Sequence, residues 1–125
     1  MDNVKDITLA YIAGLFDGDG SIYICKAPPR KSKFPSHFLV MSIHSSRLDI
    51  IYWLKETFGG YIRKGSNNKH QVLIWTKSAI QGRVFLELIY PYLRMKKEQA
   101  KFAIEFQKEK ESKNRKALTL KEIRK

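Results

Sequence analysis

At 125 residues and 43% hydrophobic composition, the chain has room for one domain with a real core. Its 24 Lys and Arg exceed its 12 Asp and Glu, and the net charge of +12 favours a polyanionic partner, because neutralised phosphates release counterions. We expect an intracellular protein, since there is no apolar run of the roughly 20 residues that a bilayer needs, no secretory signal and only one cysteine, Cys25. A lone cysteine excludes an intrachain disulfide and a cysteine-rich zinc site.

The first half of the chain predicts a helix followed by a long-looped hairpin. Apolar residues recur at helical spacing before an Asp-Gly-Asp-Gly run, where two glycines are expected to end the helix. Alternation of apolar and polar residues predicts the two strands, and prolines interrupt the basic loop between them. In chain order, the expected elements are a helix over 7–16, a strand over 21–26, a loop over 27–35 and a strand over 36–44.

The second half repeats this order and adds helices. A Gly-Gly pair ends the expected second helix, a Gly-Ser-Asn-Asn turn separates two strands, Ser78 is placed to cap the third helix, and Pro91 ends it. The expected elements are a helix over 45–58, strands over 61–64 and 70–77, and helices over 78–89 and 94–109. We therefore predict one α+β domain over 1–110, an antiparallel sheet with its helices on one face, and a charged tail over 111–125.

The sheet face without helices is predicted to be polar and cationic. Alternation assigns to it Tyr23, Ser42, Tyr61, Arg63 and Gln71. Such a face is a candidate nucleic-acid surface, although an ordinary solvated sheet face has the same pattern.

Small residues stand out on the first predicted helix. Ala10, Ala13 and Gly14 interrupt bulky apolar residues, and a glycine inside a helix costs roughly 1 kcal/mol relative to alanine. Close approach of another backbone would offset this cost, and a second copy of the same helix would create a two-fold interface. The alternative is a glycine tolerated against the sheet of its own chain.

Two aspartates follow that helix. Asp17 and Asp19 lie where the helix dipole is negative and carbonyl groups are free, which is unfavourable unless a cation is bound. Carboxylate and carbonyl oxygens suit a hard cation such as Mg²⁺. An aspartate that bonds its own turn is a good alternative for Asp17 and a poor one for both residues. If two copies of the helix pack side by side, both Asp19 carboxylates and both Gly18 carbonyls meet at the two-fold axis.

This stretch is similar to the motif of the LAGLIDADG homing endonucleases, with residues 12–20 at its nine positions. Residues 58–62 resemble the entry to that family's second hairpin, and 91–100 resemble its PxLxxKxxQA segment, so that the resemblance covers 7–108. It implies an αββαββα fold with a saddle-shaped sheet in the DNA major groove. It also implies Mg²⁺-dependent hydrolysis of both strands, with Mn²⁺ as a substitute and Ca²⁺ supporting binding without cleavage. One motif in this length implies the homodimeric branch.

The resemblance also implies roles for individual residues. Asp19 would be the catalytic metal ligand, Gly18 would offer its carbonyl, and Asp17 would tie down the helix end. Lys96 would lie near the scissile phosphate; Ser45, where many relatives carry Gln, and Arg47 are further pocket candidates. The predicted dimer interface is Ala10, Ala13, Gly14 and Asp17. The predicted DNA contacts, along a site on the order of 20 base pairs, are Tyr23, Arg30, Lys31, Lys33, Ser42, Tyr61, Arg63, Lys69 and Gln71.

Three other functions fit parts of the pattern. A maturase on this scaffold would bind intron RNA, a non-cleaving relative would only bind DNA, and an unrelated basic α+β protein would bind RNA. The intact Asp17 and Asp19 argue against the second, and the third leaves the Asp-Gly-Asp-Gly run unexplained. Maturase and nuclease activities can share one chain, so the first remains an alternative.

Overall fold

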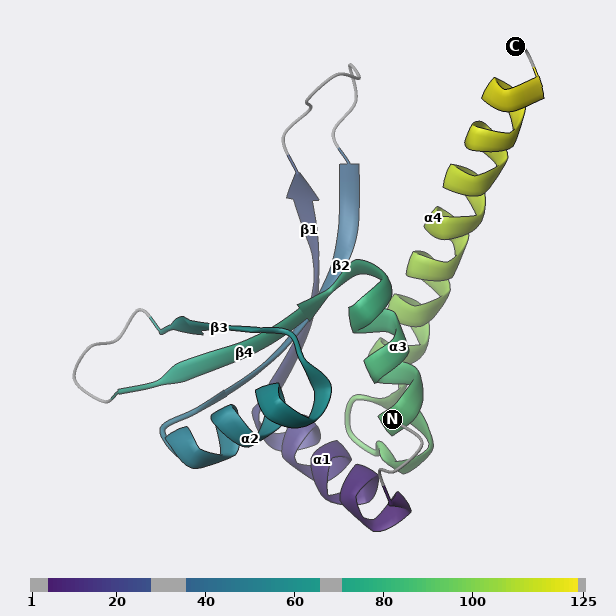
Figure 1. Ribbon diagram of the computed structural model, residues 1–125. Helices are drawn as coiled ribbons and strands as arrows, with labels where there is room; N and C mark the ends of the chain where they lie inside the picture. The colour runs from purple at the N-terminus through teal and green to yellow at the C-terminus, as the bar shows by residue number, and fades with distance from the viewer. Residues whose placement is uncertain (1–4, 28–35, 66–70, 124–125) are drawn as a thin grey trace.

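The computed structural model describes residues 5–27, 36–65 and 71–123, with 114–123 described as backbone only. The predicted order of helices and hairpins is confirmed, and it is αββαββα followed by one long helix (Figure 1). The elements are α1 (Asp6–Asp19), β1 (Gly20–Ala27), β2 (Ser36–Ser45), α2 (Leu48–Phe58), β3 (Tyr61–Lys64), β4 (Leu73–Ser78), α3 (Ala79–Ile89), a 3-10 turn (Tyr90–Tyr92) and α4 (Lys97–Ile123).

The four strands form one antiparallel sheet in the order β1-β2-β4-β3. The hairpin of β1 and β2 extends beside α4, whereas the hairpin of β3 and β4 extends in a different direction, along α2 and away from α3 and α4 (Figure 1). Because side chains alternate along a strand, Met41 and Ile43 of β2 and Trp75 of β4 face the helices, where all three are fully buried. None of the described helices covers the opposite face of the sheet (Figure 1).

Helices α1, α2 and α3 each contribute apolar residues to the core beneath the sheet. Phe16 of α1, Leu54 of α2 and Phe85 of α3 are completely buried there. The indole N–H of Trp75 donates to the carbonyl of Gly59 at 2.7 Å, which joins β4 to the end of α2. This core fixes the direction in which α1 ends, and hence the placement of its acidic residues.

Several predicted boundaries differ from the structure. Helix α1 continues to Asp19 instead of ending at Phe16, because the Asp17 carboxylate and carbonyl both find partners in the segment before α4. Strand β4 begins three residues later than predicted, at Leu73, and α4 runs without interruption into the predicted tail. Ser78 precedes α3 as predicted, but its side chain makes no capping hydrogen bond in the described structure.

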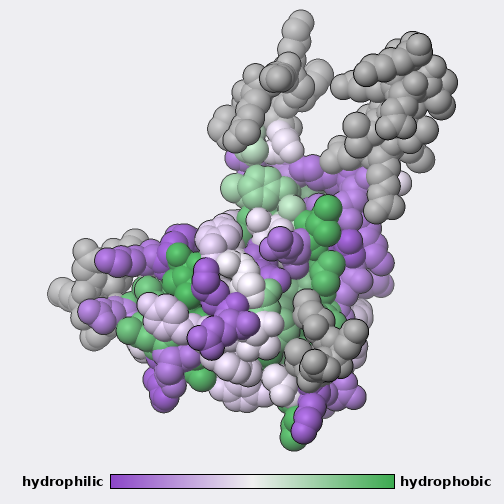
Figure 2. Space-filling model, viewed as in Figure 1, coloured by the Kyte–Doolittle hydropathy of each residue, from purple (hydrophilic) through white to green (hydrophobic). Residues whose placement is uncertain are grey.

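Among the described helices, none combines the length and the apolar character that crossing a membrane requires. Figure 2 shows hydrophilic and apolar side chains intermixed over the face that it presents.

Candidate functional site

Asp17 points inward at the end of α1. Its side chain is 8% exposed, and its carboxylate accepts hydrogen bonds from the backbone N–H of Arg94 at 2.8 Å and of Lys96 at 2.9 Å. Burial alone would raise the pKa of this carboxyl group, but the N–H groups of 94–96 and the Lys96 ammonium outweigh that effect and lower the pKa below its ordinary value. Asp17 therefore binds the start of α4 to the end of α1.

Lys96 is brought to the same helix end by this contact. Its ammonium donates to the carbonyl of Asp17 at 2.7 Å, where a positive charge interacts favourably with the negative end of the helix dipole. Gly18 and Asp19, which follow directly, are both exposed. The structure thus gathers Asp19, the Gly18 backbone and Lys96 at one end of α1, although Lys96 is 77 residues away from Asp19 in the sequence.

The donor set at this helix end fits half of a divalent-metal site. A carboxylate and backbone carbonyls are oxygen ligands of the kind that Mg²⁺ and Ca²⁺ prefer. Within the described part of the chain, no three His, Cys, Asp or Glu side chains cluster closely enough to hold a metal ion. A site built on Asp19 therefore needs further oxygens, from a second carboxylate, from phosphate or from water.

Ser45 and Arg47 lie at the junction of β2 and α2. The register pairs Gly20 with Ile43, so this end of β2 lies at the Asp19 end of β1. The Ser45 hydroxyl accepts the Arg47 backbone N–H at 3.0 Å, and the Arg47 guanidinium makes two bonds to Asp49 at 3.0 and 3.2 Å. The Asp49 carboxylate raises the pKa of Arg47, but both side chains are mostly exposed, so water and salt weaken the pair.

The open face of the sheet carries a row of hydroxyl groups. The register places Ser21, Ser42, Thr76 and Tyr61 side by side across the four strands. Ser42 and Thr76 are buried in the middle of the row, and the Thr76 hydroxyl has no hydrogen-bond partner in the described structure. Tyr61 at the edge is 49% exposed, so the edges of the row, rather than its centre, are accessible.

The predicted residues of this face are placed unequally. Tyr23, Ser42, Tyr61 and Arg63 all alternate away from the core, as expected. Gln71 precedes β4 and lines a hollow with Leu48 and Tyr52 of α2, so the alternation of β4 does not place it on the open face, and its contact with DNA stays a prediction. Four other predicted contacts, Arg30, Lys31, Lys33 and Lys69, lie outside the described residues.

Sequence analysis missed Ser21, Thr76 and His44, which also alternate onto the open face. The signal for Thr76 was available: it follows Trp75, and a tryptophan in a half-covered strand favours the core side. An alternation that places Gln71 on the open face is inconsistent with Trp75 facing the core.

The predicted interface residues of α1 divide into two pairs. Ala10 and Gly14 are exposed on the outer side of the helix. Ala13 is fully buried and Asp17 nearly so within their own chain, and the prediction for these two is therefore corrected, since neither side chain can face a second helix. A Cβ atom added at Gly14 or Gly18 would meet nothing within 4 Å, so the packing of this chain does not require glycine at either position.

The chain therefore has the αββαββα class of fold, with two diverging antiparallel hairpins and an acidic end on its first helix. Residues 12–112 match the model of the LAGLIDADG endonuclease family, and the chain belongs to that family. No match was found among curated proteins.

Solved structures of homing endonucleases share the fold. I-CvuI in complex with the I-CreI target is 20% identical with a TM-score of 0.71, over 82% of this chain and 66% of that chain. The archaeal intron-encoded I-Vdi141I, complexed with DNA, is 20% identical with a TM-score of 0.69, over 82% and 68%. I-SmaMI bound to cleaved DNA is 23% identical with a TM-score of 0.72, over 85% and 37%. This chain thus spans about two thirds of the first two chains and well under half of the third.

Proposed function

We propose that the chain is half of a site-specific DNA endonuclease, which acts as a homodimer and hydrolyses one phosphodiester in each strand. The observation that carries the proposal is the exposed Asp19 carboxylate at the end of α1, with the Lys96 ammonium held at the same helix end by Asp17. The family membership and the DNA-bound structures of I-CvuI and I-Vdi141I support the same conclusion.

The outer side of α1 supports the homodimer. Ala10, Gly14 and Gly18 are exposed and small, and the two glycines have open space around them. A glycine inside an exposed helix costs roughly 1 kcal/mol relative to alanine, and the chain gains nothing in return from its own packing at Gly14. A second α1 lying against this side would bring two helix ends, and two Asp19 carboxylates, to one axis.

In this dimer, Asp19 and the Gly18 carbonyl would hold a divalent metal, Mg²⁺ in the active enzyme. Such a metal supplies a water of lowered pKa and neutralises charge that develops on the phosphate and the leaving oxygen. Lys96 would place its ammonium beside the phosphate and offset the same negative charge. Asp17 orients Lys96 without touching the DNA, because its carboxylate is occupied by the backbone of 94–96.

The open face of the sheet would lie in the major groove. Tyr23, Tyr61 and Arg63 are exposed there, and an arginine can donate two bonds to a guanine edge. The net charge of +12 supplies general attraction to phosphate, which does not depend on sequence.

The experiment compares cleavage with binding. The substrate is a plasmid that carries the two DNA segments flanking the gene. These segments are joined directly to each other, without the gene or any surrounding intron. Wild-type protein in Mg²⁺ is expected to linearise it, and in Ca²⁺ to bind it without cutting. Asp19→Asn should abolish cleavage and leave binding in place, whereas the matched control Glu56→Gln, which changes an exposed acid on α2, should keep both cleavage and binding.

Each failure has a distinct meaning. Cleavage by Asp19→Asn at the wild-type rate would remove this carboxylate from the mechanism. Binding by the wild type without cleavage in Mg²⁺ or Mn²⁺ would leave a DNA-binding protein on an endonuclease scaffold. Binding to the intron transcript, with none to the duplex, would favour a maturase.

A further inference from the structure

Strand β2 extends beyond its neighbour in the middle of the sheet. Pairing of β2 with β4 ends at Val40 and Ser78, where the chain leaves the sheet and enters α3 at Ala79. Residues 36–39 of β2 continue outward with β1 on one side only. An isolated two-stranded hairpin is marginally stable in water, so this outer part of the hairpin needs another source of support.

Side chains of α4 occupy the place that β4 leaves. The Leu39 backbone N–H donates to the Gln107 side-chain carbonyl at 3.2 Å, and Gln107 is 3% exposed. The Lys110 ammonium donates to the His37 carbonyl and, at 2.7 Å, to the Ser36 hydroxyl. Alternate residues of a strand point their N–H and C=O groups to the same side. The backbone groups of Leu39 and His37 therefore both point away from β1, toward the place that a longer β4 would occupy.

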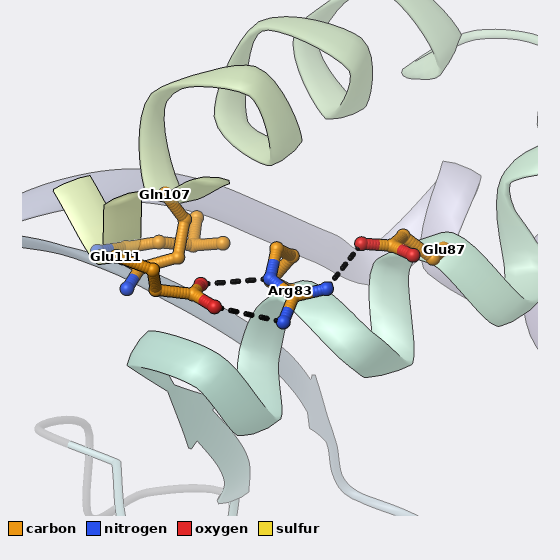
Figure 3. A network of polar contacts seen from close by, with 5 residues as sticks. Arg83, Glu87, Gln107 and Glu111 are labelled. Atoms are coloured by element: carbon orange, nitrogen blue, oxygen red, sulfur yellow. Dashed lines mark hydrogen bonds and ion pairs between the residues drawn. The ribbon is translucent and has the colours of Figure 1, made fainter. Parts of the chain in front are cut away.

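The same turn of α4 is anchored to the body of the protein. Arg83 of α3 donates two hydrogen bonds to Glu111, at 2.7 and 2.8 Å, and a third at 2.5 Å to Glu87 (Figure 3). The Arg83 and Glu111 side chains are only 17% and 13% exposed, so this pair is partly protected from water. Figure 3 shows Gln107 beside Glu111 on α4, with Arg83 between Glu111 and Glu87.

We propose that Gln107 and Lys110 are positioning residues for DNA recognition, which fix the angle of the outer β1–β2 hairpin to the rest of the sheet. The inference rests on the proposed function. In a duplex along the open face, this angle decides which base pairs the outer parts of β1 and β2 reach, where residues 24–27 pair with 36–39. Neither positioning residue needs to touch DNA, since both act through the backbone of 36–39.

The first test uses the free protein. Gln107→Leu removes the acceptor for Leu39, and Lys110→Met removes the donor for His37 and Ser36. The matched control is Lys108→Met, which removes the same charge from an exposed position of α4. Hydrogen exchange is expected to become at least about tenfold faster at the amides of 36–39 in both variants. It should stay unchanged in β3 and β4, and throughout the control. Unchanged exchange at Leu39 in both variants would overturn the proposed support.

The second test measures recognition. The probe is the duplex that wild-type protein recovers from a randomised library in Ca²⁺, together with all its single-base variants. Lys110→Met should lose discrimination about tenfold, the size of one base contact, at one continuous group of base pairs in each half-site. A uniform loss across the site, or the same profile as Lys108→Met, would overturn the positioning role.

The two tests separate this inference from the function on which it rests. If wild-type protein recovers no duplex, the proposed function fails and the role in recognition fails with it, while the exchange experiment still decides whether α4 supports the hairpin. If Gln107→Leu does not fold, Lys110→Met carries both tests, because its site is only partly buried.

Discussion

Two hydrogen bonds join Lys96 to Asp17, and Lys96 donates both of them, to two different groups of Asp17. The Lys96 backbone N–H donates to the Asp17 carboxylate at 2.9 Å, and the Lys96 ammonium donates to the Asp17 carbonyl at 2.7 Å. One aspartate of the acidic run is therefore a structural residue, and the other, Asp19, is left exposed, where we propose that it binds metal. The two aspartates differ because the Asp17 side chain points into the protein, whereas the Asp19 side chain is exposed.

Asp17→Asn is predicted to destabilise the protein by about 1–3 kcal/mol, the cost of leaving a buried donor without an acceptor. The amide has one oxygen for the two N–H groups of Arg94 and Lys96, and its NH₂ group would face one of them. Denaturant unfolding of the two proteins measures the difference. A change below about 0.5 kcal/mol, typical of ordinary surface substitutions, would contradict the prediction.

The same carboxylate gives stability a dependence on acid pH. Since the pKa of Asp17 is lowered in the folded state, its contribution is fully present above the ordinary pKa of an aspartate and is lost as pH falls through the folded value. Unfolding free energies measured between neutral and strongly acidic pH should therefore fall less steeply in Asp17→Asn than in the wild type. Parallel curves would show that Asp17 is not linked to folding.

Two glycines of the motif should respond oppositely to substitution. Gly14→Leu adds a side chain where the monomer has open space, so the monomer should fold while the dimer and cleavage are lost. Gly20→Ala places a Cβ 2.4 Å from the Phe16 ring and 2.5 Å from its carbonyl, so folding itself should suffer. Sedimentation and thermal unfolding of both variants distinguish the outcomes. A dimeric, active Gly14→Leu would exclude this side of α1 from the interface.

Neighbouring basic residues on β3 offer a matched pair for the DNA face. Arg63 alternates onto the open face and Lys64 onto the helix side, and both are exposed. Arg63→Ala should weaken specific binding by about 1–3 kcal/mol, as expected for a lost base contact, whereas Lys64→Ala should show only the small effect of one lost charge. Binding titrations at a fixed salt concentration measure both. Equal effects would show that the strand contributes charge alone.

The order of the elements could be predicted because each has a strong local signal, such as the Gly59-Gly60 pair after α2 and the alternation of β1. The acidic helix end could also be predicted, because two aspartates at the negative end of a helix dipole need compensating partners. The contacts of Gln107 and Lys110 with β2 were not predictable in this way, because they join residues 68 and 73 positions apart. Neither residue differs in sequence from an ordinary polar residue of a helix.

The prediction of which β4 residues face the open side of the sheet also failed, because of how the alternation is counted. In a strand over 70–77, Gln71 and Trp75 fall on the same face, so an outward Gln71 would also turn Trp75 outward. The larger apolar residue decides the matter, since burying Trp75 stabilises the fold far more than burying Gln71 would. Weighing the two together would have placed Thr76 on the open face.

The close packing of Gly20 on the Phe16 ring would constrain the evolution of the proposed reaction centre. Asp19 directly precedes Gly20, whose backbone rests on the fully buried Phe16 ring. The direction of the Asp19 side chain is therefore set by the interior of the protein. Substitutions deep in the hydrophobic interior that tilt this ring would redirect the carboxylate without altering any residue that meets the substrate. Selection for activity would then constrain the interior as tightly as the surface.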